Sequence, residues 1–199
     1  MNNKDTKETN VLAQASILMV AGIITRIIGV LYRSPLTSVI GDEGNGYYGI
    51  AVNIYTMILL VSSYSIPMAV SKVVSSKLAV HQYRNAHKVF KCALMYVLVV
   101  GGIASLITFF GASILIPSNQ PKAIPVLRIL APTIFFSGFL GVFRGYFQAH
   151  GTMVPTSLSQ IIEQVANAVI SIGAALLFIH VFAGGDADKV PVFGAMGSA

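Results

Sequence analysis

Residues 92–116 read CALMYVLVVGGIASLITFFGASILI and contain no charged side chain. A helix rises about 1.5 Å per residue, so this run is long enough to cross the roughly 30 Å hydrocarbon core of a bilayer. Residues 49–70 form a second uncharged run of similar length. Neither run alternates polar and apolar residues, as the strands of a membrane barrel do. Both runs therefore predict transmembrane helices.

Three more apolar runs extend this pattern to an all-α, polytopic transmembrane bundle. They cover residues 11–32, 126–147 and 154–182, and they follow a short tail, residues 1–10. Residues 190–199 read as the start of an incomplete sixth span, because ten residues are too few to cross. We therefore expect residues 11–199 to be the N-terminal part of a larger bundle. Turn-rich polar segments predict loops at 41–46, 117–121 and 184–188.

The composition agrees with a membrane protein. Of the 199 residues, 10% are charged and 55% are hydrophobic, whereas about a quarter are charged in a soluble domain. A soluble globule and a disordered chain are both excluded. No hydrolase, protease or phosphate-loop motif is present, and the His and single Cys residues lack metal-ligand spacing. We expect no enzyme activity, no metal, no cofactor and no nucleic-acid partner.

The basic residues predict the orientation. Five of them lie between the second and third spans, and Lys4 and Lys7 precede the first span. The opposite side has only Arg33, Lys122 and Lys189. Lys and Arg gather on the cytoplasmic side of membrane proteins, so we expect a multi-pass protein with a cytoplasmic N-terminus. The basic connection would also attract anionic membrane lipids.

The first span carries two arginines on one face. At about 100° per residue, Gly22, Arg26, Gly29 and Arg33 fall within one narrow stripe. Arginine presents a fixed fork of donors that matches phosphate oxygens, so Arg26 and Arg33 are candidates to line an anion-binding cavity. Alternatively, Arg26 pairs with a carboxylate and Arg33 extends to the membrane interface.

Three other spans supply further candidates. In the fifth span, Gln160, Glu163 and Asn167 share a polar face, which fits either a cavity or hydrogen bonding between helices. Glu163 could pair with Arg26 or Arg128, or bind a coupling ion such as H⁺ or Na⁺. Asn53 lies on one face of the second span with Pro67, which predicts a kink or a break. Arg128, near the outer end of the fourth span, could reach a cavity.

Two motifs resemble a known family. The first comprises residues 25–33, 35–36 and 40–46, and the second comprises residues 143–148, 153–156 and 159–164. Together they resemble the SpoVB/YtgP group of MurJ-like transporters in the multidrug/oligosaccharidyl-lipid/polysaccharide exporter superfamily. The resemblance covers most of residues 12–170.

The resemblance implies the N-terminal lobe of a MATE/MurJ-like fold, in which two lobes surround a cationic cavity. Such proteins flip undecaprenyl-pyrophosphate-linked glycans, including lipid II, across the bacterial plasma membrane for cell-wall, spore or polysaccharide synthesis. Arg26 and Arg33 match the two first-span arginines that the family uses for pyrophosphate. The partners implied are a lipid-linked oligosaccharide and the remaining C-terminal spans, with possible coupling to the membrane potential, H⁺ or Na⁺.

Two other functions stay open. A drug or cation antiporter of the same superfamily would depend on Glu163 and would tolerate loss of Arg26. A non-transporting scaffold for envelope or spore assembly would use both polar stripes only for helix packing.

Overall fold

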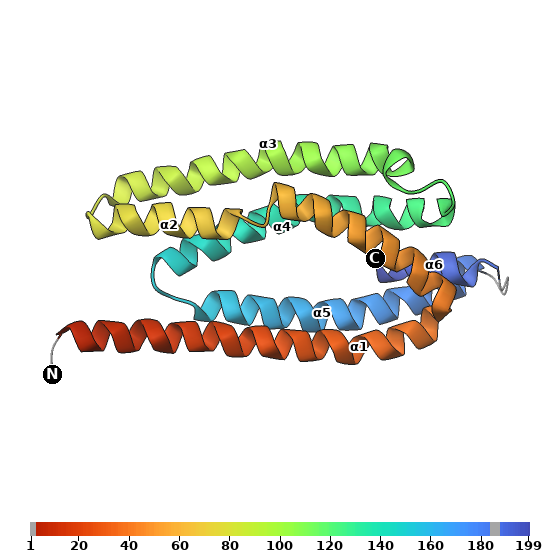
Figure 1. The fold of residues 1–199 in the computed structure, drawn as a ribbon, viewed down its shortest axis with the longest axis horizontal. Helices are drawn as coiled ribbons and strands as arrows, with labels where there is room; N and C mark the ends of the chain where they lie inside the picture. Colours follow the sequence, from red (N-terminus) through yellow and green to blue (C-terminus); the bar gives the residue numbers. More distant parts are fainter. Residues whose placement is uncertain (1–2, 184–187) are drawn as a thin grey trace.

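The computed structural model describes residues 3–183 and 188–199 as helices joined by short connections (Figure 1). The helices are α1 (Asn3–Ser62), α2 (Ile66–Ala79), α3 (Tyr83–Leu115), the 3₁₀ turn η1 (Pro121–Ala123), α4 (Ile124–Ala149), α5 (Val154–Phe178), the π-helical turn η2 (Ile179–Ala183) and α6 (Val190–Ser198). Within the part of the chain that the structure describes, four stretches are long and apolar enough to cross a membrane: Leu12–Ala79, Tyr83–Leu115, Pro121–Ala149 and Val154–Phe182.

The first two predicted spans are helical segments of α1 that meet at a sharp kink at Gly41, so the predicted polar loop at residues 41–46 is wrong. Within this segment only Gly41 leaves the helical conformation, with φ 74° and ψ 172°. The chain reverses there, and α1 folds back on itself (Figure 1). A single residue suffices because glycine tolerates a backbone region that side chains exclude. Helical hydrogen bonding then resumes through Asp42 and Glu43.

The Gly41→Ala variant is expected to lower the free energy of unfolding by about 1–3 kcal/mol, because a Cβ is strained at this φ and ψ. Space is not the cause, since nothing lies within 4 Å of an added methyl group. Gly46→Ala, also in open space but with an ordinary helical backbone, is the control and should not destabilise. Thermal unfolding of the detergent-solubilised protein compares the two variants. Equal stability of the two would contradict a conformational role for Gly41.

The second predicted span, residues 49–70, is broken. Helix α1 ends at Ser62, a turn follows, and α2 begins at Ile66 with Pro67 in its first turn. Proline lacks an N–H donor, and this position needs none. The predicted basic loop is likewise mostly helical, because Lys72 and Lys77 lie in α2 and the later basic residues lie in α3. The loop at 117–121 contains an irregular segment, while residues 184–187 of the third predicted loop lie outside the described residues.

The helices form two layers (Figure 1). One layer holds α5 and the first half of α1, and the other holds α2, α3, α4 and the second half of α1. Helix α6 closes one end, where Gly194 approaches both Ile40 of α1 and Ile179 after α5. At the opposite end lie the N-terminus and the α2–α3 and α4–α5 connections.

Among the described residues, three apolar clusters pack the helices against one another within each layer. In one, Tyr47 and Ala51 of α1 pack against α3, α4 and Ala195 of α6. In the second, Val70 and Val74 of α2 pack against Val97 and Val142. The third joins Leu36 and Ile40 to Ala175 of α5. Most remaining large apolar side chains are exposed, as expected for helices that face lipid.

Candidate functional site

A cavity of about 650 Å³ lies between the two layers. It is bounded by the end of α1, by α2 and α4 from one layer, and by α5 from the other. Apolar residues and Tyr55 line part of it, but its walls also carry charge. The polar lining includes Lys72, Ser137, Arg144, Gln148, Gln160 and Glu163. A polar cavity of this size inside an apolar bundle is typical of a ligand site.

Glycines of α4 shape one wall of this cavity. A methyl group added at Gly145 would lie 2.5 Å from the carbonyl oxygen of Pro67, and one at Gly141 would lie 3.2 Å from the Pro67 ring. Helix α4 can therefore pack directly on the break between α1 and α2. This close packing places Arg144 and Lys72 on the walls of the same cavity.

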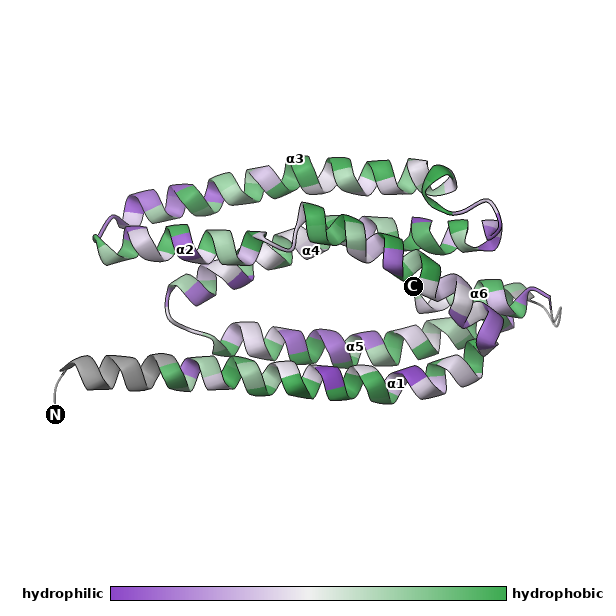
Figure 2. Ribbon diagram, in the orientation of Figure 1, coloured by the Kyte–Doolittle hydropathy of each residue, from purple (hydrophilic) through white to green (hydrophobic). Residues whose placement is uncertain are grey.

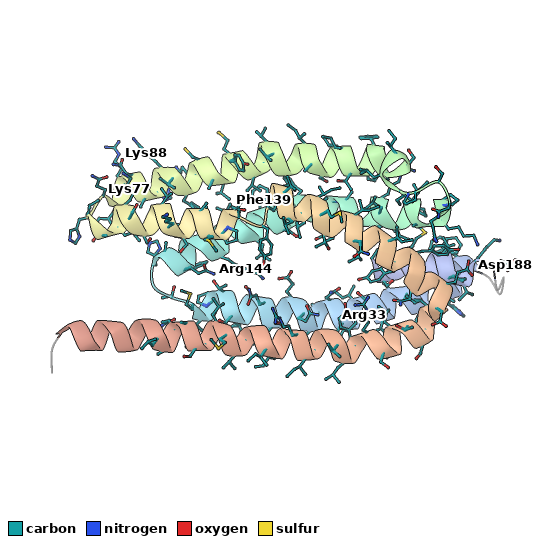
Figure 3. All side chains as sticks on the ribbon, in the orientation of Figure 1. Arg33, Lys77, Lys88, Phe139, Arg144 and Asp188 are labelled. Carbon is teal, nitrogen blue, oxygen red and sulfur yellow. The ribbon has the colours of Figure 1, made fainter. Side chains whose placement is uncertain are left out.

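Arg144 is the central charged residue of the site. Its Nη2 atom lies 2.5 Å from Oε2 of Glu163, and its Nε donates a hydrogen bond of 3.1 Å to Oγ of Ser159. The Ser159 hydroxyl in turn donates to the carbonyl oxygen of Thr156. The Arg144 side chain is 18% exposed and that of Glu163 is 55% exposed. Figure 3 shows Arg144 directed from α4 toward the space between the layers.

The polar face predicted for the fifth span is present on α5, where hydrophilic residues interrupt the apolar helix (Figure 2). Gln160 and Glu163 line the cavity. Asn167 accepts a hydrogen bond of 3.0 Å from Oγ of Ser171 on its own helix. The expected partners of Glu163, Arg26 or Arg128, are wrong: its partner is Arg144.

The structure separates the other candidates. Arg33 and Asn53 line a second cavity of about 250 Å³, enclosed by the two halves of α1. Arg26 and Arg128 are exposed and line neither of these two cavities. Within residues 3–183 and 188–199, no three His, Cys, Asp or Glu side chains are grouped so that they could hold a metal.

The sequence contains a pattern that points to Arg144. Ser137, Gly141, Arg144 and Gln148 are spaced by four, three and four residues, which places them on one face of a helix. This spacing predicts a stripe of small and polar residues on the fourth span, similar to the stripes on the first and fifth spans.

Comparison with known proteins identifies the family. Residues 11–193 match the family described as Polysaccharide biosynthesis protein. The chain belongs to this family. It is 28% identical over 179 residues to the lipid II flippase MurJ of Bacillus subtilis (strain 168), covering 85% of this chain and 33% of that protein. It is also 28% identical over 169 residues to the stage V sporulation protein B of the same organism, covering 82% of this chain and 32% of that protein.

A third relative, the uncharacterized membrane protein YabM of the same organism, is 24% identical over 166 residues, which cover 83% of this chain and 30% of that protein. The chain thus spans about a third of the length of the curated relatives it matches. No solved structure matches the chain significantly. The activity named among the relatives is lipid flipping, which is transport and not an enzymatic reaction. Together with its long apolar helices, the match makes this chain a membrane protein of the polysaccharide-biosynthesis family.

Proposed function

We propose that this chain is the N-terminal lobe of a transporter that flips an undecaprenyl-pyrophosphate-linked glycan across the bacterial plasma membrane. The observation that carries the proposal is the polar cavity between the layers, with Arg144 and Lys72 on its walls. A lipid-linked pyrophosphate needs a positive, hydrated path for its head while its tail stays in lipid. Guanidinium and ammonium groups are the usual protein partners of phosphate.

The arginines of α1 extend this path. Arg33 and Asn53 line the second cavity, and Tyr55, two residues further along α1, lines the first. Figure 3 places Arg144 and Arg33 at different positions along the length of the bundle. We propose that Arg33 forms a second binding position for the pyrophosphate. We also propose that Arg26 and Arg128 face the remaining spans of the transporter. An exposed guanidinium within a membrane helix needs a polar or protein surface beside it.

The charge distribution supports a cytoplasmic N-terminus. Lys77 and Lys88 lie at the end of the bundle that also holds the N-terminus (Figures 1 and 3). Basic residues gather on the cytoplasmic side. In this orientation the cavity that contains Arg144 is nearer to the cytoplasm, and Arg33 is nearer to the outer side (Figure 3).

The test is flipping by the full-length protein in vesicles that contain a fluorescent undecaprenyl-pyrophosphate-linked sugar, measured as loss of accessibility to a membrane-impermeant quencher. We expect flipping, and a reduction of about tenfold for Arg33→Gln, because hydrogen bonds to charged groups contribute about 1.5–3 kcal/mol. His87→Gln, at an exposed position of α3, is the control and should flip at the wild-type rate. Absence of flipping by the wild-type protein would refute the proposal.

One observation favours an antiporter as the second candidate, namely the carboxylate of Glu163 on the wall of the cavity. An antiporter would use this group to bind its coupling ion. The same vesicles, loaded with a cationic dye, separate the two functions. Dye efflux that Glu163→Gln abolishes, without any lipid flipping, would establish the antiporter instead.

A further inference from the structure

The ion pair between Arg144 and Glu163 occupies the place where an anionic ligand would bind. Both residues line the cavity, and the carboxylate of Glu163 lies 2.5 Å from the guanidinium. A guanidinium has five N–H donors, and here Nη2 and Nε are engaged by Glu163 and Ser159. The carboxylate is therefore in the position that a phosphate oxygen would take.

The two partners are held very differently. Arg144 is 18% exposed and fixed by the hydroxyl of Ser159, which is itself bonded to the backbone of α5. Glu163 is 55% exposed, so water can solvate its carboxylate once it leaves. Exposed ion pairs contribute little, because solvent competes for both charges. The guanidinium is thus a fixed group, and the carboxylate is the partner that can be exchanged.

We propose that Glu163 is the resident counter-ion of Arg144, and that the pyrophosphate of the lipid-linked substrate displaces it. This inference rests on the proposed function. Lys72 lies on the wall of the same cavity, so the site keeps one positive charge in excess while the ion pair is intact. A pyrophosphate, which carries more negative charge than one carboxylate, competes well for both cations.

The exchange would also loosen the two layers. The ion pair links α4 in one layer to α5 in the other, and these two helices contact each other little elsewhere. When the substrate takes Arg144, this link to Glu163 is lost. Binding of the head group would therefore remove one of the two links that Arg144 makes to α5, while the bond to Ser159 remains.

The experiment measures the Kd of undecaprenyl pyrophosphate for the full-length protein in nanodiscs, with neutral undecaprenol as the control ligand for the tail. Glu163→Gln is expected to bind undecaprenyl pyrophosphate about two- to fivefold more tightly than the wild type. The substitution removes the carboxylate that competes for Arg144, and the free energy of that ion pair is of the size found for exposed pairs. Arg144→Gln is expected to bind about tenfold more weakly or worse. Undecaprenol binding should not change in either variant.

The Glu43→Gln variant is the matched control. It removes another carboxylate–cation pair, with Lys122, outside the cavity, and should leave the Kd unchanged. Melting temperatures check that each variant is folded, and Glu163→Met, similar in length and helix propensity, replaces Glu163→Gln if the latter fails to fold.

Two results would overturn the inference in different ways. Weaker or unchanged binding by Glu163→Gln, with normal binding by the wild type, would make the ion pair a structural link only and leave the flippase proposal standing. No binding of undecaprenyl pyrophosphate by the wild type or any variant would refute the proposed function itself, and the inference with it.

Discussion

Replacing Arg144 with alanine in the full-length protein is expected to reduce the rate of lipid flipping by about tenfold or more. The variant loses the guanidinium that faces the cavity and leaves Glu163 without its partner. The flipping rate of Arg144→Lys should lie between that of the wild type and that of Arg144→Ala. An ammonium keeps the charge but lacks the planar fork that binds two oxygens at once. The quenching assay in vesicles measures all three rates.

The control for Arg144 is Arg84→Ala, because Arg84 is an exposed arginine at the start of α3. It should flip lipid at the wild-type rate, which separates the effect of the site from that of total positive charge. Melting temperatures of both variants show whether the loss is one of folding. An Arg144→Ala protein that is folded and fully active would remove this cavity from the transport path.

The Gly145→Ala variant is expected to lower the free energy of unfolding by about 1–3 kcal/mol, as overpacking of a tight contact usually does. The added methyl group would meet the carbonyl oxygen of Pro67 at 2.5 Å and the Cβ of Val70 at 3.0 Å. The carbonyl belongs to the backbone and cannot rotate away. Helix α4 must therefore move from the break between α1 and α2, and the cavity wall moves with it.

Gly102→Ala on α3 is the matched control, since its methyl group would make only ordinary contacts, at 3.9 Å or more, with the Phe135 ring. Alanine also has the higher helix propensity, so this variant should be as stable as the wild type or more so. Thermal unfolding of both proteins in detergent gives the comparison. Equal melting temperatures would show that α4 does not pack on Pro67 as described.

Hydropathy was enough to predict long apolar helices, because burial in lipid requires long apolar runs whatever their tertiary contacts. It was not enough at residues 41–46, where Gly, Asp, Glu and Asn read as a loop. Those residues keep helical hydrogen bonds because one glycine accommodates the reversal alone. A turn signal in a sequence marks a change of direction, but it does not give the number of residues that the change requires.

The candidate site could be predicted only in part. The polar face of α5 was readable because Gln160 and Glu163 share helical spacing. The partner of Glu163 was not readable, since it depends on how α4 and α5 approach each other across the layers. Arg144 also resembles an interface anchor when only its distance from the helix end is considered. Contacts between helices that are distant in the sequence depend on the tertiary fold. The spacing of residues within one helix does not predict them.

Among the described residues, two glycines have a positive φ, and they mark places where the chain passes between the layers. Gly41 (φ 74°) lies where α1 leaves the layer of α5, and Gly151 (φ 74°) lies where the chain returns to it between α4 and α5. Glycine has the widest range of backbone conformations of any residue. The two crossings can therefore act as hinges at opposite ends of the bundle, so that the layers can rotate against each other while every helix remains intact.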